Sequence, residues 1–174
     1  MRFDANITIV IATHNRPDCL RLAVESALRQ THTRWRMLVL GDGCDARTPN
    51  ALQDIADPRV SYIDLPVRFG EQSGPNSVGM SLATTDWIAF LNHDDLWLPD
   101  HLEYALEKLA RSGADLFLGQ AAFTDSSGTT QRIVSEHRND NLACATSGHV
   151  QLWRTQAARG AARLFNSSHN CAET

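Results

Sequence analysis

The sequence lacks long apolar runs and paired cysteines, and each absence excludes a class of protein. The longest uninterrupted apolar stretch is about five residues, Trp87 to Leu91, whereas roughly 20 are needed to span a bilayer. None of the four cysteines forms a C-x-x-C pair, so neither a zinc knuckle nor a dithiol redox motif is predicted. Met1 to Asn6 lack the apolar region of a signal peptide. We therefore expect a cytoplasmic protein with no transmembrane segment.

Basic residues are also scarce in the main body of the chain. Residues 1–129 hold 11 Lys and Arg against 17 Asp and Glu, whereas residues 130–174 hold 5 against 3, which gives a net charge of −4. A nucleic-acid-binding surface needs clustered basic residues, so we expect no nucleic-acid partner. The hydrophobic share of 43% and the length of 174 residues are typical of one soluble globular domain.

Three common nucleotide and hydrolase motifs are missing. The turn from Thr13 to Pro17 has no G-x-G-x-x-G, and the only lysine, Lys108, belongs to no Walker A loop. A G-x-S-x-G nucleophile elbow is absent as well. These absences argue against a dinucleotide-dependent dehydrogenase, a P-loop NTPase and an α/β-hydrolase.

Along most of the chain, short apolar segments typical of strands alternate with segments whose apolar residues recur at the period of a helix with one buried face. Strands are predicted at 7–12, 35–40, 59–65, 87–91, 115–123 and 131–135, and helices after Pro17, at 48–56, at 76–84 and from Pro99 to Gly113. This alternation predicts an α/β fold with one doubly wound, mainly parallel sheet flanked by helices. For the mildly basic stretch 152–165 we expect a helix packed on the core, with a membrane-surface helix as the alternative.

Polar residues follow three of the predicted strands. They are Thr13, His14 and Asn15 after the first strand, Asp42 after the second, and Asn92, His93, Asp94 and Asp95 after the fourth. Ligands of doubly wound sheets bind beyond the carboxyl ends of the strands. We therefore expect these residues to converge on one site.

The segment from Asn92 to Asp95 is the sharpest of these clusters. Adjacent carboxylates repel unless a cation or hydrogen bonds keep both ionised, and oxygen ligands of this kind suit Mg²⁺ or Mn²⁺. The alternative is that Asp94 and Asp95 cap the helix that begins near Pro99. Asp42 could accept a hydrogen bond from a nucleobase or ribose, or be an ordinary turn aspartate. His14 could stack on a base, although a lone loop histidine usually has no such role.

In this order, the motifs resemble the N-terminal part of a family 2 glycosyltransferase of the GT-A fold. The matching blocks are Ile7 to Pro17, Trp35 to Cys44, Asp57 to Leu65, Gly70 to Asn76, and Trp87 to Asp100. The resemblance implies transfer of a sugar from a nucleotide-diphosphate donor, with a family preference for UDP, to an acceptor hydroxyl. It also implies inversion of configuration and a divalent metal, Mg²⁺ or Mn²⁺. The acceptor could be a glycan, a lipid or a small molecule.

The resemblance also assigns roles to individual positions. The nucleotide-binding residues that it implies are Ala12, His14, Asp42, Gly70, Asn76, Asn92 and His93. It implies Asp94 as the metal ligand, at the D-x-D position, with Asp95 as a second contributor. The chain departs from the family pattern at Gly41, His14, Pro75 and Asn92, where the family often has an acid, a tyrosine, an arginine and an aspartate. Because Asn92 supplies no charge, we expect weaker metal binding.

On this resemblance, residues 1–174 form a single GT-A-like domain. We expect its nucleotide-binding half at about 1–123 and an acceptor-side segment, 124–174, that is incomplete at the C-terminus. The family's general base lies in a later motif, so no base is identified and a truncated chain is expected. The rival interpretations are a non-catalytic nucleotide-sugar-binding module or inactive fragment, and a nucleotidyltransferase. The latter needs a basic, glycine-rich first loop, where this chain offers only Arg16.

Overall fold

The strand β1 (Ile7–Thr13) lies at the centre of the sheet and is buried along its whole length. β2 (Trp35–Gly41) and β4 (Trp87–Phe90) pair with it in parallel on either side. Apolar side chains on both faces are what a parallel sheet covered on both sides requires. The computed structural model describes residues 4–125, 127, 129–134 and 151–158.

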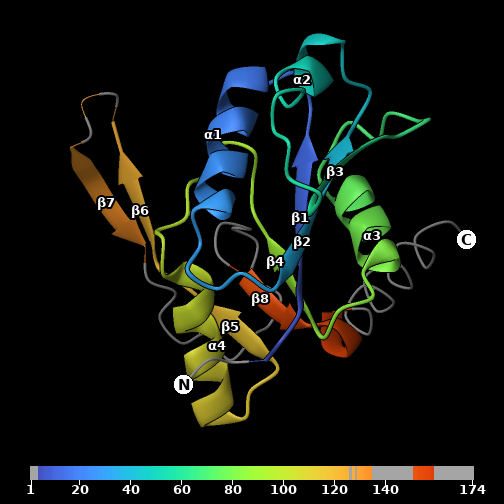
Figure 1. Cartoon of the computed structure of the whole chain (residues 1–174). Helices are drawn as coiled ribbons and strands as arrows, with labels where there is room; N and C mark the ends of the chain where they lie inside the picture. Colours follow the sequence, from blue (N-terminus) through green and yellow to red (C-terminus); the bar gives the residue numbers. More distant parts are fainter. Residues whose placement is uncertain (1–3, 126, 128, 135–150, 159–174) are drawn as a thin grey trace, which may run out of the picture.

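The main sheet has six strands in the order β3-β2-β1-β4-β8-β5. β3 (Val60–Asp64) extends the parallel set, whereas β8 (Gln151–Arg154) runs antiparallel to both β4 and β5 (Leu116–Leu118). Strand order reverses between β1 and β4, which makes this the topological switch point of the sheet. The predicted doubly wound, mainly parallel α/β sheet is confirmed (Figure 1).

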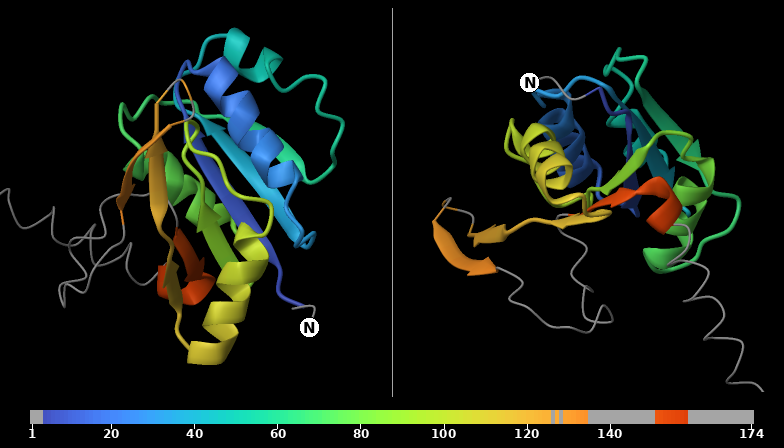
Figure 2. Two further views of the ribbon diagram at one scale, coloured as in Figure 1. Left: turned by 90° about the vertical axis from the view of Figure 1, so that its left-hand side faces the viewer. Right: turned by 90° about the horizontal axis from the view of Figure 1, so that it is seen from below.

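Helices cover both faces of the sheet (Figure 2). α1 (Pro17–Leu28) and α4 (His101–Ser112) lie on one face and α3 (Ser73–Leu82) on the other. α1 begins with proline, whose fixed φ suits the first helical turn, and α4 ends at Gly113, where φ is +69°. The described helices are all too short or too polar to cross a bilayer.

Alternating residues of β1 supply two separate cores. Ile7, Ile9 and Ile11 pack with the apolar stripes of α1 and α4, whereas Val10 faces the side covered by α3. Gly79 lets α3 approach closely, because a Cβ at this position would lie 2.5 Å from Val10 Cγ1. The two cores hold the strand ends in place and therefore position the site.

Three predicted elements differ from the structure. The strand expected at 115–123 is broken, since β5 belongs to the main sheet while β6 (Ala121–Thr124) forms a separate hairpin with β7 (Thr130–Val134) (Figure 1). The helix expected at 48–56 is reduced to α2 (Arg47–Asn50), followed by turns. Only Thr48 and Leu52 of this segment are buried, so little packing stabilises a longer helix.

The helix expected at 152–165 begins instead as strand β8. Leu152 is fully buried in the core beneath α1 and α4, and Trp153 packs toward the opposite core. This alternation has the period of a strand, and both neighbouring strands supply hydrogen-bonding partners. Residues 155–158 are helical, and the rest of the predicted helix lies outside the described residues.

Candidate functional site

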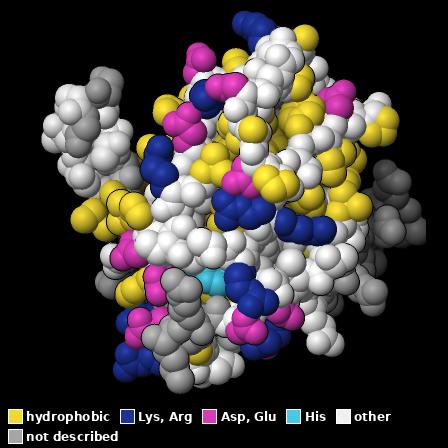
Figure 3. Space-filling view, viewed as in Figure 1, with side chains coloured by type: hydrophobic (Ala, Val, Ile, Leu, Met, Phe, Trp, Pro, Cys, Tyr) yellow, Lys and Arg dark blue, Asp and Glu magenta, His cyan; other side chains and the backbone are white. Residues whose placement is uncertain are grey.

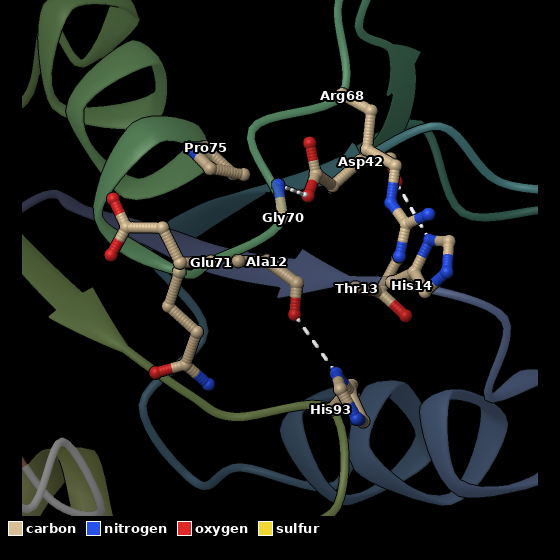
Figure 4. Close-up of a pocket in the computed structure, with 10 residues that line it drawn as sticks. Ala12, Thr13, His14, Asp42, Arg68, Gly70, Glu71, Pro75 and His93 are labelled. Atoms are coloured by element: carbon tan, nitrogen blue, oxygen red, sulfur yellow. Dashed lines mark hydrogen bonds between the residues drawn. The ribbon is translucent and has the colours of Figure 1, made fainter.

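A pocket of about 180 Å³ opens at the carboxyl edge of the sheet, beside the switch point. The end of β1, the end of β2, the loop after β3 and the residues after β4 all contribute to its wall (Figure 4). Its lining residues are Ala12, Thr13, His14, Asp42, Arg68, Gly70, Glu71, Gln72, Pro75 and His93. Strand ends far apart in the sequence therefore converge on one hollow, as the polar residues after the strands predict.

Asp42 anchors the loop that follows β3. It is 5% exposed, and its carboxylate accepts the backbone N–H of Phe69 at 2.6 Å and that of Gly70 at 2.9 Å. Gly70 has φ +78°, a conformation that glycine adopts without strain. Asp42 is therefore no ordinary turn aspartate that satisfies its own loop, since it connects β2 to a segment 27 residues away.

Two histidines fasten the neighbouring strand ends to one another. His14 Nδ1 lies 2.7 Å from the carbonyl oxygen of Asp42, and His93 Nδ1 lies 3.1 Å from that of Ala12 (Figure 4). A carbonyl oxygen only accepts hydrogen bonds, so Nδ1 carries the proton in both rings. The ends of β1, β2 and β4 are held together before any ligand binds.

The turn after β4 separates its polar side chains into different roles. Asn92 Oδ1 accepts a hydrogen bond from Gln72 at 3.3 Å, and Asn92 Nδ2 donates to Asp95 Oδ2 at 2.8 Å. Asp94 is exposed, and no hydrogen bond or ion pair engages its carboxylate within the described part of the chain. α4 begins only at His101, with Asp100 at its N-cap. Asp94 and Asp95 therefore do not cap that helix.

The turn after β4 can hold a divalent metal only if a bound ligand supplies some of the coordinating atoms. Nowhere among the described residues do three His, Cys, Asp or Glu side chains gather into a set able to hold a metal ion. Mg²⁺ usually takes one or two carboxylates and completes its shell with water and substrate phosphates. The exposed carboxylate of Asp94 could supply one such metal ligand. In the neighbouring Asp95, one carboxylate oxygen already accepts a hydrogen bond from Asn92.

The structure brings together five of the predicted site residues and leaves four outside the pocket wall. Ala12, His14, Asp42, Gly70 and His93 line the pocket. Asn76 is half-buried in the first turns of α3. Asn92, Asp94 and Asp95 lie on either side of His93 in the turn after β4, outside the lining.

Arg68 and Glu71 line the pocket although the sequence motifs did not single them out. The sequence does place both residues near Gly70, in the glycine-containing loop after the third predicted strand. A charged side chain next to such a turn is common in any loop. Only the fold shows that this loop closes over the site.

Tyr62 explains why glycine occupies position 41, where the family often has an acid. A Cβ on Gly41 would overlap the phenol oxygen of Tyr62. Burial is the main cause that raises the pKa of Tyr62 far above its usual value, with smaller contributions from Cys44 and Asp64. A neutral phenol thus fills the space beside Asp42 that a second carboxylate would need.

Charges on the face in Figure 3 are mixed. Lys and Arg side chains are interspersed with Asp and Glu, and hydrophobic side chains lie between them (Figure 3).

The strand order, the pocket at the switch point and the polar strand ends define an α/β fold of the GT-A type. Solved structures match it at low sequence identity. TarS 1-349 of S. aureus in complex with UDP superimposes with a TM-score of 0.74 at 14% identity, covering 89% of this chain and 48% of that one. The mannosyltransferase PcManGT from Pyrobaculum calidifontis, in complex with GDP-Man and Mn²⁺, gives 0.60 at 16% identity, with 66% and 35% covered.

Residues 8–171 match the model of the family described as Glycosyl transferase family 2, and the chain belongs to that family. The resemblance of the sequence motifs is thereby confirmed. The succinoglycan biosynthesis protein ExoO of Rhizobium meliloti (strain 1021) is 32% identical over 131 residues, which cover 75% of this chain and 37% of ExoO. The UDP-Glc:alpha-D-GlcNAc-diphosphoundecaprenol beta-1,3-glucosyltransferase WfgD of Escherichia coli is 21% identical, with 78% and 53% covered. The chain thus spans only part of the length of these relatives.

Proposed function

We propose that the chain binds a nucleotide-diphospho-sugar, foremost a UDP-sugar, as the donor in metal-dependent transfer of the sugar to an acceptor hydroxyl with inversion. The observation that carries this proposal is the pocket at the switch point, whose lining residue His93 is followed in the chain by the exposed Asp94. Membership of the family supports it. So do the name of WfgD, which specifies UDP-Glc, and the TarS structures with UDP and UDP-GlcNAc.

The nucleoside belongs, in this proposal, at the end of the pocket formed by β1 and β2. Each carboxylate oxygen of Asp42 accepts one backbone N–H, and each has two acceptor sites. Asp42 can therefore accept a further N–H or O–H from a base or ribose without releasing the loop. Ala12 and His14 frame this end and Gly70 allows the loop to turn, and we propose Asn76, in α3, as a further nucleotide-binding residue.

The diphosphate belongs at the β4 end, next to His93, Asn92 and Asp94. His93 lines the pocket at this end, and Asn92 is already held by hydrogen bonds to Gln72 and Asp95. Asp94 would hold Mg²⁺ or Mn²⁺ together with the diphosphate, with Asp95 as a second contributor. Such a cation stabilises the negative charge that develops on a departing diphosphate.

In the proposed reaction the bond between the anomeric carbon and the diphosphate oxygen breaks, and a bond from the acceptor oxygen to that carbon forms. The diphosphate leaves with the bonding electrons, and the acceptor proton passes to a base. The wall formed by β1, β2 and β4 contributes orientation, since it holds the donor in one pose. We propose residues 1–123 as this donor-binding half and residues 124–174 as the acceptor side.

A thermal-shift screen with UDP, GDP, CDP and TDP, each with and without Mn²⁺, tests the proposal. Stabilisation by a ligand follows mass action, so UDP with Mn²⁺ should give the largest rise in Tm. Uridine and inorganic pyrophosphate serve as controls for the two halves of the ligand. A chain that no nucleoside diphosphate stabilises, with or without Mn²⁺, would refute the function.

Turnover separates transfer from binding alone. Asn92 stands where the family has the first acid of its D-x-D motif, and this observation favours a second candidate, a nucleotide-sugar-binding module without activity. The measurement is release of UDP from UDP-sugars by the chain with Mn²⁺. Release at a rate above the uncatalysed reaction supports the transferase, whereas tight UDP binding without release supports the module.

A further inference from the structure

Arg68 lies in the pocket wall, and its charged guanidinium has no partner among the described residues. It lines the pocket together with Thr13, His14 and Asp42, and its guanidinium has no ion pair or hydrogen bond to any part of the chain that the structure describes. In Figure 4 its side chain points from the loop after β3 toward His14. A guanidinium without a partner among the described residues is free to contact a ligand.

The stem of Arg68 is held from two sides. Gly43 has φ +64°, and a Cβ at Gly43 would lie 3.0 to 3.3 Å from the Arg68 methylenes, so the stem packs on a residue without a side chain. The next two residues, Phe69 and Gly70, donate their N–H groups to Asp42. The base of the side chain is thus fixed, and only the terminal part of Arg68 needs to be ordered when a ligand binds.

Strand order places Arg68 at the nucleoside end of the pocket. The strands run β3-β2-β1-β4, so Arg68 after β3 and Asp42 after β2 lie on one side of β1, and Asp94 after β4 lies on the other. A metal-bound diphosphate at Asp94 is therefore on the far side of β1 from Arg68. In the proposed pose of the donor, the base is therefore the group nearer to Arg68.

We propose that the guanidinium of Arg68 stacks on the face of the donor nucleobase and is a specificity-determining contact for a nucleoside over a bare diphosphate. This inference rests on the proposed binding of a nucleotide-sugar and assigns one contact in it. Guanidinium is planar and weakly hydrated, and it stacks on aromatic rings, whereas the ammonium of lysine is a compact, strongly hydrated charge. The contact therefore depends on the shape of the arginine as well as on its charge.

The test is calorimetric titration of UDP and of inorganic pyrophosphate, both with Mn²⁺, into the wild type, Arg68→Ala and Arg68→Lys. Loss of a cation–π contact predicts a rise of about 5- to 30-fold in the Kd of UDP for Arg68→Ala. Arg68→Lys should restore at most part of the lost affinity, because lysine lacks the planar stacking surface, and the pyrophosphate Kd should not change. Arg111→Ala, an exposed arginine on α4 outside the pocket, is the matched control and should bind UDP like the wild type.

The possible results of the titration separate the stacking contact of Arg68 from the proposed function. UDP binding by the wild type with an unchanged Kd in Arg68→Ala overturns the stacking contact alone. An equal loss for pyrophosphate shows that Arg68 acts on the diphosphate, and full rescue by Arg68→Lys shows that any cation suffices there. Either result overturns the stacking contact. A wild type that binds no UDP overturns both this contact and the proposed function.

Discussion

The carboxylate of Asp42 accepts the backbone N–H of Gly70 at 2.9 Å and thereby ties the end of β2 to the loop that closes the pocket. The adjacent N–H of Phe69 reaches the other carboxylate oxygen at 2.6 Å. A nearly buried carboxylate with two such donors is an anchor for the loop. The same side chain can therefore order the wall of the pocket and present an acceptor to the donor nucleoside.

Asp42→Asn should destabilise the fold and loosen this loop. The amide of asparagine has one acceptor oxygen, so one backbone N–H loses its partner, at a cost of about 1–3 kcal/mol in the free energy of unfolding. Hydrogen exchange should become faster at the amides of Phe69 and Gly70, and UDP should lose more affinity than pyrophosphate. Asp45→Asn is the control, because Asp45 pairs with Arg47 at the surface. Unchanged exchange at both amides would contradict the anchoring role.

Asp94→Asn should remove most of the Mn²⁺-dependent part of nucleotide binding. Asparagine keeps an oxygen but loses the negative charge that hard cations prefer, so the Kd of UDP with Mn²⁺ should rise about tenfold or more, which is 1.4 kcal/mol or more. Calorimetry with Mn²⁺ and with EDTA measures the difference. The fold should be intact, since the side chain is exposed.

Two comparison variants sharpen that experiment. Asp95→Asn should cost less than Asp94→Asn, because Asn92 already donates a hydrogen bond to Asp95. Glu107→Gln, on α4 and paired with Arg111, removes a carboxylate outside the site and should have no effect. The metal assignment fails if Asp94→Asn and Glu107→Gln bind UDP and Mn²⁺ equally well.

Gly79 and Val10 should be energetically coupled. A methyl group on Gly79 meets Val10 Cγ1 at 2.5 Å, so Gly79→Ala should destabilise the fold by about 1–3 kcal/mol through overpacking. Adding Val10→Ala removes the clashing methyls, and the double variant should be more stable than the sum of the single changes predicts. Denaturant unfolding of the four proteins gives the coupling energy. Strict additivity would show that α3 does not pack on β1 in this way.

His101 should make stability depend on pH between 4 and 6.5. Its ring lies between Trp97 and Phe117, and burial lowers its pKa to about 4 although the charge of Asp100 acts in the opposite direction. In the unfolded chain the pKa is about 6.5, so between these values the unfolded state binds the proton and the native state does not. Stability is therefore complete above pH 6.5 and declines as the pH falls toward 4, by about 3 kcal/mol.

The variant His101→Phe keeps an aromatic ring among the same neighbours and removes the titrating group. Its stability relative to the wild type should increase steadily as the pH is lowered from 6.5 to 4. Urea unfolding at half-unit intervals of pH measures this difference. Parallel stability curves for the two proteins would show that His101 is not kept neutral by the fold.

Much of the sheet could be predicted from the sequence, because its signals are local. Ile7, Ile9 and Ile11 belong to one apolar core and Val10 to the other, so this strand is covered on both faces. Gly113 ends α4 at a positive φ, as its place after the last apolar residue predicts. β8 was missed because Gln151 to Arg154 is short, and it is a strand only through its pairing with β4 and β5.

The sequence alone determined the residue types at the carboxyl edge of the sheet, because polar residues come directly after β1, β2 and β4. Parallel strands deliver those side chains to one edge whatever the details of packing. Only the tertiary structure decided what each of them does. Asp42 finds its hydrogen-bond partners 27 residues further along the chain, and Arg68 reaches the pocket because its loop is held there. Such contacts depend on closing long loops over a packed sheet, and no local pattern encodes them.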